Sequence, residues 1–328
     1  MKKSLLLSGA LIIPALFLFN FSRKKEPLTW KPVVTATSCE ARHESAFARV
    51  GDKFVLLGGR KIKAVNIFDA VKKEWTNGAM PPLEMNHFQA VEYKGEVYVI
   101  GAFTGSFPHE KPIPTIYIYN PKTDKWREGP VIPADRQRGA AGAVVHNNKI
   151  YLVCGITDGH YDGHVAWFDE FDPATGKWRK LPDAPHVRDH VSVGVAENQL
   201  VIAGGRRSYF KIGDTMTLTT PEVDVFNFKT NKWETMPAAQ NIPTQRAGNT
   251  AAVLGSKVII IGGESIQELA HNETEAFDVK TRTWEKLTPL NTGRHGTGAV
   301  VYKGKVFIAA GSAKHGGGPE INSMEVLE

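Results

Sequence analysis

One interval recurs five times along this chain and constrains its fold more than any other feature: an aromatic residue stands seven positions before a tryptophan. The pairs are Phe68 and Trp75, Tyr119 and Trp126, Phe171 and Trp178, Phe226 and Trp233, and Phe277 and Trp284. Between them, short apolar runs alternate with clusters of glycine and polar residues, which is typical of short antiparallel strands joined by turns. A small sheet of this kind cannot bury both of its faces alone. Repetition at about 50 residues therefore predicts sheets that stack against one another.

A second interval gives the number of units. In five of them an arginine stands 16 positions before a glycine pair or its degenerate equivalent, and in the second unit Asn86 stands 15 positions before Gly101. The arginines are Arg42, Arg138, Arg188, Arg246 and Arg294. The sequence therefore predicts six units.

The two ends of the chain are predicted to complete one unit together. The last unit begins at Arg294 and reaches Glu328 without a tryptophan, whereas Trp30 stands 12 positions before Arg42. Four internal tryptophans stand 10 to 13 positions before the next arginine, so Trp30 has the spacing of an outer strand. Closure of this kind leaves no exposed sheet edge. We predict an all-β, six-bladed β-propeller formed by residues 27–328 and closed by an N-terminal strand that completes the last blade.

The glycine pair and the late tryptophan resemble the repeat of the Kelch family of β-propellers. The resemblance covers nearly all of the chain after residue 27, although several glycine signals are degenerate, such as Cys154-Gly155 and Ala310-Gly311. In family members that bind peptides or small molecules, the site lies at one mouth of the central channel. The resemblance therefore implies a site built from the entries to the innermost strands and from the loops after the glycine pairs.

The N-terminus has the pattern of an export element. Two lysines precede a 17-residue uncharged stretch at positions 5–21, and the basic cluster Arg23-Lys24-Lys25 follows it. We predict that residues 1–26 are a signal peptide, with an uncleaved membrane anchor as the alternative. The protein is then expected to be exported, either periplasmic or at the cell surface. Any contact with a membrane would be through that anchor.

Charge and cysteine content narrow the classes of partner. The formal charge is +6, but the first 26 residues carry +4 of it, which leaves +2 for residues 27–328. No run of lysine and arginine occurs in that part, so nucleic acid is not an expected partner. The two cysteines, Cys39 and Cys154, are too few for a disulfide framework, and we expect both to be free thiols.

Residues at one repeat position form a ring about the axis of a propeller, so we expect the five arginines to surround one mouth of the channel. Like charges at such distances repel, and an anionic ligand or acidic partners would offset the repulsion. Neighbouring positions add histidine, amide and acidic side chains. The predicted ligand-binding residues are Arg42, His43, Glu44, Asn86, His87, Arg138, Arg188, Asp189, His190, Arg206, Arg246, Asn249, Arg294 and His295. The resemblance adds the loop residues Arg60, His109, His160, Arg207, Glu264 and His315.

These side chains suit a small anionic or sugar-like ligand. Arginine binds carboxylate, sulfate or phosphate through two parallel hydrogen bonds, and Asn, Asp and His suit sugar hydroxyls. One alternative is a protein–protein interaction module that takes a protein or peptide, the commonest use of Kelch propellers. Another is a sugar epimerase or mutarotase similar to the sialic-acid epimerases, with Glu44 and His190 as acid–base candidates. The sequence leaves open whether the site is catalytic.

No cofactor and no metal are predicted. A copper enzyme resembling galactose oxidase is disfavoured, because that family uses two Tyr, two His and a thioether-linked Cys on seven blades. The spacing His160-x-x-x-His164, with Asp162 between, would be a possible metal motif on a helix. Here it lies in a glycine-rich loop, where nothing fixes the two imidazoles on one face.

Overall fold

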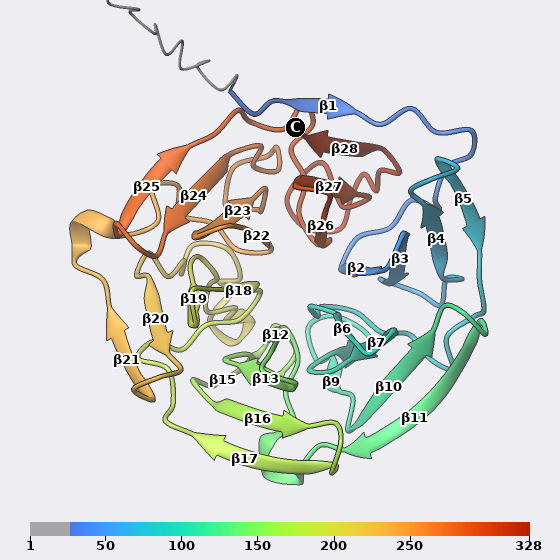
Figure 1. Cartoon of the computed structure of the whole chain (residues 1–328). Coiled ribbons are helices and arrows are strands. Elements are labelled where there is room, and N and C mark those ends of the chain that lie inside the picture. The colour runs from blue at the N-terminus through green and yellow to red at the C-terminus, as the bar shows by residue number, and fades with distance from the viewer. Residues whose placement is uncertain (1–26) are drawn as a thin grey trace, which may run out of the picture.

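Six four-stranded antiparallel sheets surround a central channel in the computed structural model, which describes residues 27–328 (Figure 1). Blade one contains β2 (Ser45–Val50), β3 (Lys53–Gly58), β4 (Asn66–Asp69) and β5 (Glu74–Asn77). Blade two contains β6 (Val91–Tyr93), β7 (Glu96–Val99), β10 (Thr115–Asn120) and β11 (Lys125–Val131). Blade three contains β12 (Gly142–His146), β13 (Lys149–Val153), β16 (Phe168–Asp172) and β17 (Lys177–Leu181).

The second half of the ring repeats this order, with the innermost strand of each blade first. Blade four contains β18 (Val193–Ala196), β19 (Gln199–Ile202), β20 (Asp224–Asn227) and β21 (Lys232–Thr235). Blade five contains β22 (Thr250–Leu254), β23 (Lys257–Ile261), β24 (Thr274–Asp278) and β25 (Thr283–Lys286). Blade six contains β26 (Ala299–Tyr302), β27 (Lys305–Ala309), β28 (Met324–Leu327) and β1 (Trp30–Pro32). The predicted six-bladed propeller is confirmed.

The N-terminal strand closes the ring as the sequence predicts. Strand β1 pairs antiparallel with β28, and Trp30 lies opposite Leu327. The Trp30 ring is buried, and its Nε1 donates a hydrogen bond to Thr274 Oγ1 of blade five at 2.9 Å. The two ends of the described chain therefore lie side by side (Figure 1).

The seven-residue interval is the register of the two outer strands of a blade. In each of five blades the aromatic residue of the third strand lies directly opposite the tryptophan of the fourth. The two rings lie 4.9–5.3 Å apart between centroids, a contact distance that favours aromatic pairs. Cross-strand pairs of this kind stabilise a sheet through their side chains, which explains why the interval recurs.

The hydrophobic core is divided into layers between neighbouring blades. Val55 and Leu57 of blade one, for example, pack with Val97 and Val99 of blade two. All four side chains are buried. Each blade therefore covers the face of the next, as expected for a repeat that cannot bury its own surfaces.

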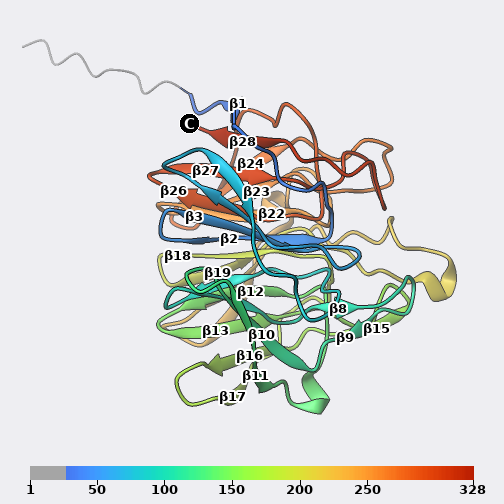
Figure 2. The same cartoon turned by 90° about the vertical axis from the view of Figure 1, so that its right-hand side faces the viewer.

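Additional segments extend from one end of the ring. They are the hairpin of β8 (Phe103–Thr104) and β9 (Lys111–Pro112), the hairpin of β14 (Ile156–Asp158) and β15 (Asp162–His164), and the short 3-10 helix η2 (Phe210–Ile212). Figure 2 shows β8, β9 and β15 on the same side of the blades. Two other 3-10 turns, η1 (Ala134–Arg136) and η3 (Ala238–Gln240), connect outer strands to the next blade.

The predicted signal peptide or anchor, residues 1–26, lies outside the described residues. Among the residues that are described, no helix has the length and apolar character needed to span a bilayer.

Candidate functional site

The five repeated arginines lie inside their own blades. Each is at most 1% exposed. Their guanidinium groups donate to the backbone carbonyl at the glycine signal of the same blade, over 2.6–3.2 Å. The carbonyls belong to Gly58, Cys154, Gly204, Gly262 and Ala310. The 16-residue interval is thus the separation between an arginine and the carbonyl that it holds.

The third strand of each blade supplies a further partner. Nη1 of Arg246 lies 2.6 Å from a carboxylate oxygen of Glu275. Asp169, Asp224 and Glu325 pair in the same way with Arg138, Arg188 and Arg294, and Asn66 Oδ1 accepts from Arg42 at 2.7 Å. The expectation that these guanidinium groups gather at the channel mouth is therefore wrong. Four are neutralised by a carboxylate of their own blade and Arg42 is held by the amide of Asn66, so we leave all five out of the candidate site.

A different repeat position reaches the channel, two residues after each arginine and one after Asn86. These six residues have left-handed backbones with φ between 50° and 64°. They are Glu44, His87, Ala140, His190, Gly248 and Gly296. Their backbones form a closed belt: from His87 to Gly296, each N–H donates to the carbonyl of the belt residue in the preceding blade at 2.8–3.0 Å. The N–H of Ser45, next to Glu44, donates to Gly296 O and closes the circle. We call this set the channel belt.

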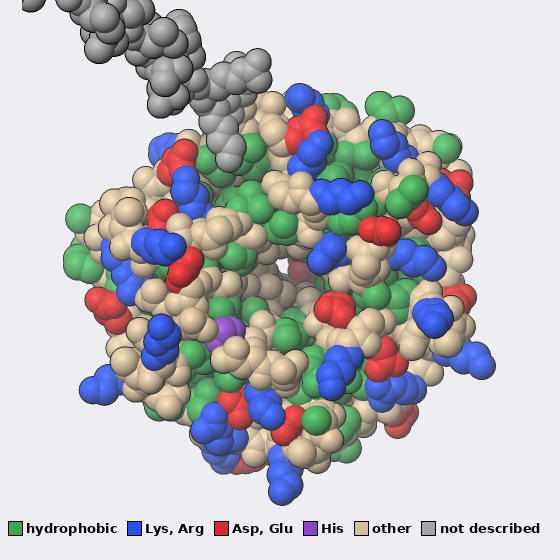
Figure 3. Space-filling model, viewed as in Figure 1, with side chains coloured by type: hydrophobic (Ala, Val, Ile, Leu, Met, Phe, Trp, Pro, Cys, Tyr) green, Lys and Arg blue, Asp and Glu red, His purple; other side chains and the backbone are tan. Residues whose placement is uncertain are grey.

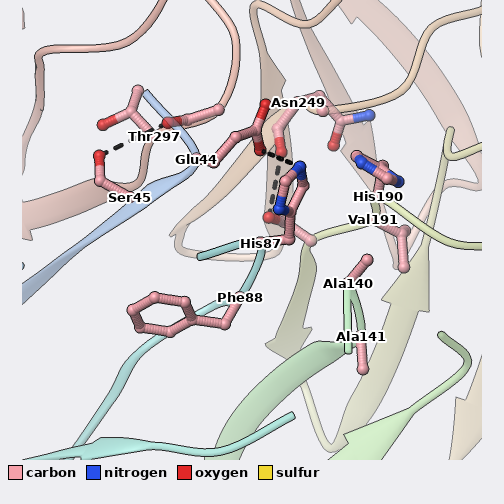
Figure 4. A pocket seen from close by; sticks show the side chains of 13 residues that line it. Glu44, Ser45, His87, Phe88, Ala140, Ala141, His190, Val191, Asn249 and Thr297 are labelled. Atoms are coloured by element: carbon pink, nitrogen blue, oxygen red, sulfur yellow. Dashed lines mark hydrogen bonds and ion pairs between the residues drawn. The ribbon is translucent and has the colours of Figure 1, made fainter. Parts of the chain in front are cut away.

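The left-handed belt directs its side chains toward the axis. Figure 4 shows Glu44 and His87 pointing toward each other, with His190 beside them. Only two of the six positions carry glycine, although a left-handed backbone costs other residues about 1–2 kcal/mol. Strain retained at one point of a structure is a recognised sign of function. The belt is therefore the starting point of the candidate site.

Three imidazoles from three different blades meet at the belt. His160, from the β14–β15 hairpin, joins His87 and His190, with ring centroids 4.7–5.0 Å apart. One nitrogen of each ring lies within 4.8 Å of the others. In the part of the chain that the structure describes, no other group of His, Cys, Asp and Glu side chains meets this distance criterion. We call these three residues the histidine cluster.

Each ring of the histidine cluster is held through its Nδ1. Nδ1 of His87 lies 2.7 Å from Asn86 Oδ1, and Nδ1 of His160 lies 3.0 Å from a carboxylate oxygen of Glu110. Nδ1 of His190 is hydrogen-bonded to Asp189. Asn86 and Asp189, both predicted as ligand-binding, thus orient histidines and lie behind the site.

Carboxylates and an arginine complete the wall of the site. Glu44 lies between two imidazoles, 3.3 Å from His87 Nε2 and 3.6 Å from His295 Nδ1. His295 Nε2 in turn lies 3.4 Å from Glu264, and Glu264 pairs with Arg206 at 2.5 Å. All five side chains are buried, so carboxylates alternate with imidazoles and a guanidinium round this part of the mouth.

Burial and neighbouring charges shift the pKa values of these groups in opposite directions. Burial lowers the pKa of His87 well below its usual value, and the adjacent His190 and His160 lower it further. Burial also lowers the pKa of His190, together with the charge of Arg206. For Glu44, burial alone would raise the pKa, but His295 and His43 outweigh it and hold the pKa below the ordinary value. These directions favour the neutral form of His87 and His190 and the ionised form of Glu44.

A cavity of about 460 Å³ opens above the belt, within the usual size range for a small-molecule site. Its charged and titratable lining consists of His43, Glu44, Arg60, His87, His160, Arg206 and Glu264. Phe107, Thr215, Met216, Gly316 and Gly317 complete it. This described lining contains no Tyr and no Cys, so the residue set of a galactose-oxidase-like copper site is not assembled here. Below the belt the channel narrows to a space of about 40 Å³, where Asn249 lies.

The opposite end of the channel is different in character. Figure 3 shows that face, which carries the turns between the first and second strands of the blades, with a central opening. Lysine and arginine side chains alternate there with acidic ones. The concentration of buried titratable groups is therefore a property of the mouth that carries the inserted hairpins.

Comparison with known proteins agrees with this architecture. A family model described as the Attractin/LZTR1 β-propeller matches residues 13–263, which is more than half of the chain. The chain belongs to this β-propeller family. A Kelch motif model also matches residues 245–291, across blade five, so the Kelch resemblance is confirmed.

Curated relatives of this Kelch propeller include Kelch-like proteins from fungi and animals. Kelch-like protein terF of Aspergillus terreus is 32% identical over 298 residues, which covers 85% of this chain and 63% of that protein. Kelch-like protein 38 of Rattus norvegicus is 24% identical, covering 84% of this chain and 45% of the relative. The chain thus spans less than two thirds of the length of either relative. A solved structure of YjhT superposes with a TM-score of 0.75 at 18% identity, covering 89% of this chain and 96% of that one, and shows the same fold.

The predicted site residues divide into groups once they are placed on the Kelch propeller. Residues that line the cavity or the belt are His43, Glu44, His87, His190, Arg206, Asn249 and His295, together with the loop residues Arg60, His160 and Glu264. Three other loop residues point elsewhere. Arg207 is exposed, His109 pairs with Asp158, and His315 is hydrogen-bonded to Gln267 O.

The sequence did not predict the histidine cluster itself. The considered motif, His160-x-x-x-His164, is not a unit, because His164 Nε2 turns away to Ser208 O at 2.8 Å. His87 and His190 share one repeat position, and this could have indicated that their side chains meet at the channel. His160 belongs to an inserted hairpin that has no counterpart in most blades, so the repeat could not place it beside them.

Proposed function

We propose that this Kelch propeller binds a small polar ligand, anionic or carbohydrate-like, in the cavity above the channel belt. The observation that carries the proposal is that buried charged side chains of both signs converge on this cavity. Burial of an ionised group costs free energy unless the group has a partner. A bound ligand that pairs with these groups in the cavity would offset that cost. Glu44, Arg206 and Glu264 offer acceptors and donors within one wall.

The lining of the cavity supports a ligand that has both polar groups and an apolar surface. Phe107 and Met216 contribute apolar surface beside the carboxylates, imidazoles and arginines. Sugars and sugar acids combine hydroxyl or carboxylate groups with apolar ring faces. In this proposal Arg206 and Arg60 supply the positive charge that would bind an anionic ligand. The five repeated arginines do not take part, because they lie within their blades.

The experiment is thermal stabilisation by a panel of compounds: a sialic acid, a uronic acid, a sulfated sugar, inorganic phosphate and neutral sugars. A ligand at about 100 times its Kd stabilises the folded state by about 2.7 kcal/mol, which is readily measured. We expect at least one acidic compound or sugar to raise the melting temperature. Following the same titration by NMR shows whether the bound sugar is also epimerised or mutarotated.

A plugged variant identifies the site. Gly317 has an ordinary backbone conformation, and a Cβ there would meet only His43 Nε2, at 4.0 Å, so Gly317→Phe extends a ring into the cavity without backbone strain. We expect this variant to fold normally and to show no rise in melting temperature when the ligand is added. The control is Lys122→Phe, on an exposed turn of blade two. Its melting temperature should rise with the ligand as in the wild type. Absence of a shift with every compound, or an equal shift in the plugged variant, would overturn the proposal.

A protein or peptide ligand is the second candidate, since Kelch propellers generally mediate protein–protein interactions. One specific observation favours it. Phe107 and Phe210 are 49% and 43% exposed at the rim of the cavity, with ring centroids 5.0 Å apart. Aromatic side chains are enriched where proteins bind one another. If Phe210→Ser abolishes capture of a protein partner while no small molecule shifts the melting temperature, this candidate replaces the first.

Export also remains a proposal. The basic and apolar pattern of residues 1–26 supports a signal peptide or an anchor. Mass spectrometry of the N-terminus of the mature protein from a periplasmic or surface fraction tests it. A chain found intact in the cytoplasm would refute it.

A further inference from the structure

The histidine cluster has a donor pattern that a bound cation would satisfy. In each ring, Nδ1 faces an oxygen that can only accept: the side-chain oxygen of Asn86 and the carboxylates of Glu110 and Asp189. Nδ1 therefore carries the proton in all three rings. In a neutral imidazole the other nitrogen, Nε2, then has a free lone pair.

We take Nε2, the nitrogen that the hydrogen bonds to Nδ1 leave free, as the ligand atom of each ring. One nitrogen of each ring lies within 4.8 Å of the others. Nε2 of His190 is buried and has no hydrogen-bond partner. Nε2 of His87 lies 3.3 Å from a carboxylate oxygen of Glu44, which is a further acceptor. Buried acceptors without a donor are costly, so this arrangement is favourable only with a positive species among them.

A ring held through Nδ1 by a carboxylate or amide oxygen is the arrangement found around metal-binding histidines. The outer hydrogen bond fixes the tautomer and the orientation of the ring, and it makes the inner nitrogen a stronger ligand.

We propose that His87, His160 and His190 bind one divalent first-row transition-metal ion at the floor of the cavity. Three imidazoles suit Zn²⁺, Cu²⁺, Ni²⁺ or Fe²⁺ and do not suit Mg²⁺ or Ca²⁺, which prefer oxygen. Both His87 and His160 line the cavity, so the remaining coordination position faces it. Three protein ligands and one open position characterise sites at which a metal binds water or an external ligand. The proposal does not depend on which compound occupies the cavity.

Metal binding is measured on the full chain without an affinity tag, after removal of metal with a chelator. Co²⁺ is the first probe, because its visible absorption reports nitrogen coordination, and competition with Zn²⁺ gives the relative affinity. We expect one ion per chain and a Zn²⁺-dependent rise in melting temperature. His87→Asn, His160→Gln and His190→Asn should each weaken Co²⁺ binding about 100-fold or more, and Glu110→Gln about 10- to 100-fold.

The matched control is His271→Gln. His271 is also a buried histidine, but in blade five, and both of its ring nitrogens have partners, Glu273 and Ser265. The His271→Gln variant should bind Co²⁺ as tightly as the wild type. If a cluster variant does not fold, Co²⁺-induced paramagnetic shifts of histidine signals in the wild-type protein identify the ligands instead. No stoichiometric binding, or shifts on histidines outside the cluster, would overturn the proposal. Because none of these readouts uses a sugar or acid ligand, the result is separate from that of the cavity test.

Discussion

Two rings of residues, only two positions apart in every repeat but one, have opposite roles in this propeller. The arginine ring is nearly constant in sequence, and each member is buried among carbonyls and a carboxylate or amide of its own blade. The channel belt varies from Glu to His, Ala and Gly, yet its backbone conformation is constant. Repetition marks the position that every blade needs, and variation marks the position where one site is built.

The physical reason lies in what each ring contacts. In five of the six blades an arginine with several donors holds the loop after the second strand in the same way. The belt backbone is satisfied by its neighbours around the circle, so its side chains are free to differ. Its polar members come from blades one, two and four, and with His160 and Glu264 they form one asymmetric site.

The largest expected effect comes from breaking the arginine ring. Arg246→Ala removes the partner of the buried Glu275 and leaves three backbone carbonyls without their donor. Loss of one member of a buried ion pair costs about 3–5 kcal/mol. We expect the midpoint of urea unfolding, followed by tryptophan fluorescence, to fall accordingly.

Lys180→Ala is the control, because Lys180 forms an ion pair with Asp135 on the surface, where both side chains are more than half exposed. Such pairs contribute about 1 kcal/mol or less. Equal midpoints for the two variants would show that the arginine ring is not a structural element.

A smaller effect is expected from glycines of the channel belt. Gly296→Ala would place a Cβ 2.7 Å from the backbone nitrogen of Glu44, at φ of 64°, and should destabilise the fold by about 2 kcal/mol or more. Gly248→Ala has the same left-handed backbone but room for the methyl group, so about 1 kcal/mol is expected. Differential scanning calorimetry measures both.

Gly317→Ala serves as the control for this pair, since its backbone is ordinary and its Cβ would be 4.0 Å from the nearest atom. It should leave stability unchanged or raise it by up to about 1 kcal/mol. If all three variants behave alike, backbone strain does not distinguish the belt.

The smallest effect concerns the thiols. Burial raises the pKa of Cys154, in the glycine signal of blade three, to about 12 and that of Cys39 to about 11. Because the thiolate is the reactive form, iodoacetamide at about pH 8 should modify neither in the folded protein within the time that denatured protein reacts completely. Mass spectrometry measures the extent.

The raised pKa values of the two thiols also make the stability of the fold depend on pH. A raised folded-state pKa favours the protonated thiol, so its contribution to stability is complete below the unfolded pKa of about 8.5 and is lost as pH rises toward 11 and 12. We expect the melting temperature to fall over this alkaline range, and less steeply in Cys154→Ala. Rapid labelling of either thiol at neutral pH would contradict the described burial.

Most of the fold could be predicted from the sequence, because each interval reports a contact within one blade. The seven-residue interval is a cross-strand register, and the 16-residue interval joins an arginine to the carbonyl it binds. Trp30 could be assigned to the last blade by spacing, and its pairing opposite Leu327 confirms the closure. Local geometry repeats, so counting was sufficient.

The site was predicted only in part. Glu44, His87 and His190 were predicted as neighbours of the strand entries, but the repeated arginines were given the role of binding an anion. The sequence shows that an arginine is present and not which way its side chain turns. Asp169 and Glu275, which neutralise two of them, stand 31 and 29 positions later and carry no mark of that partnership.

By itself, the sequence determined six sheets, their order and the closure of the ring, since these follow from contacts between residues a fixed number of positions apart. Only the tertiary structure decided that the arginines lie within the blades and that His87, His160 and His190 meet. Those three residues come from separate blades, and one stands on an inserted hairpin. Their distances depend on how the blades close around the axis, which no interval along the chain expresses.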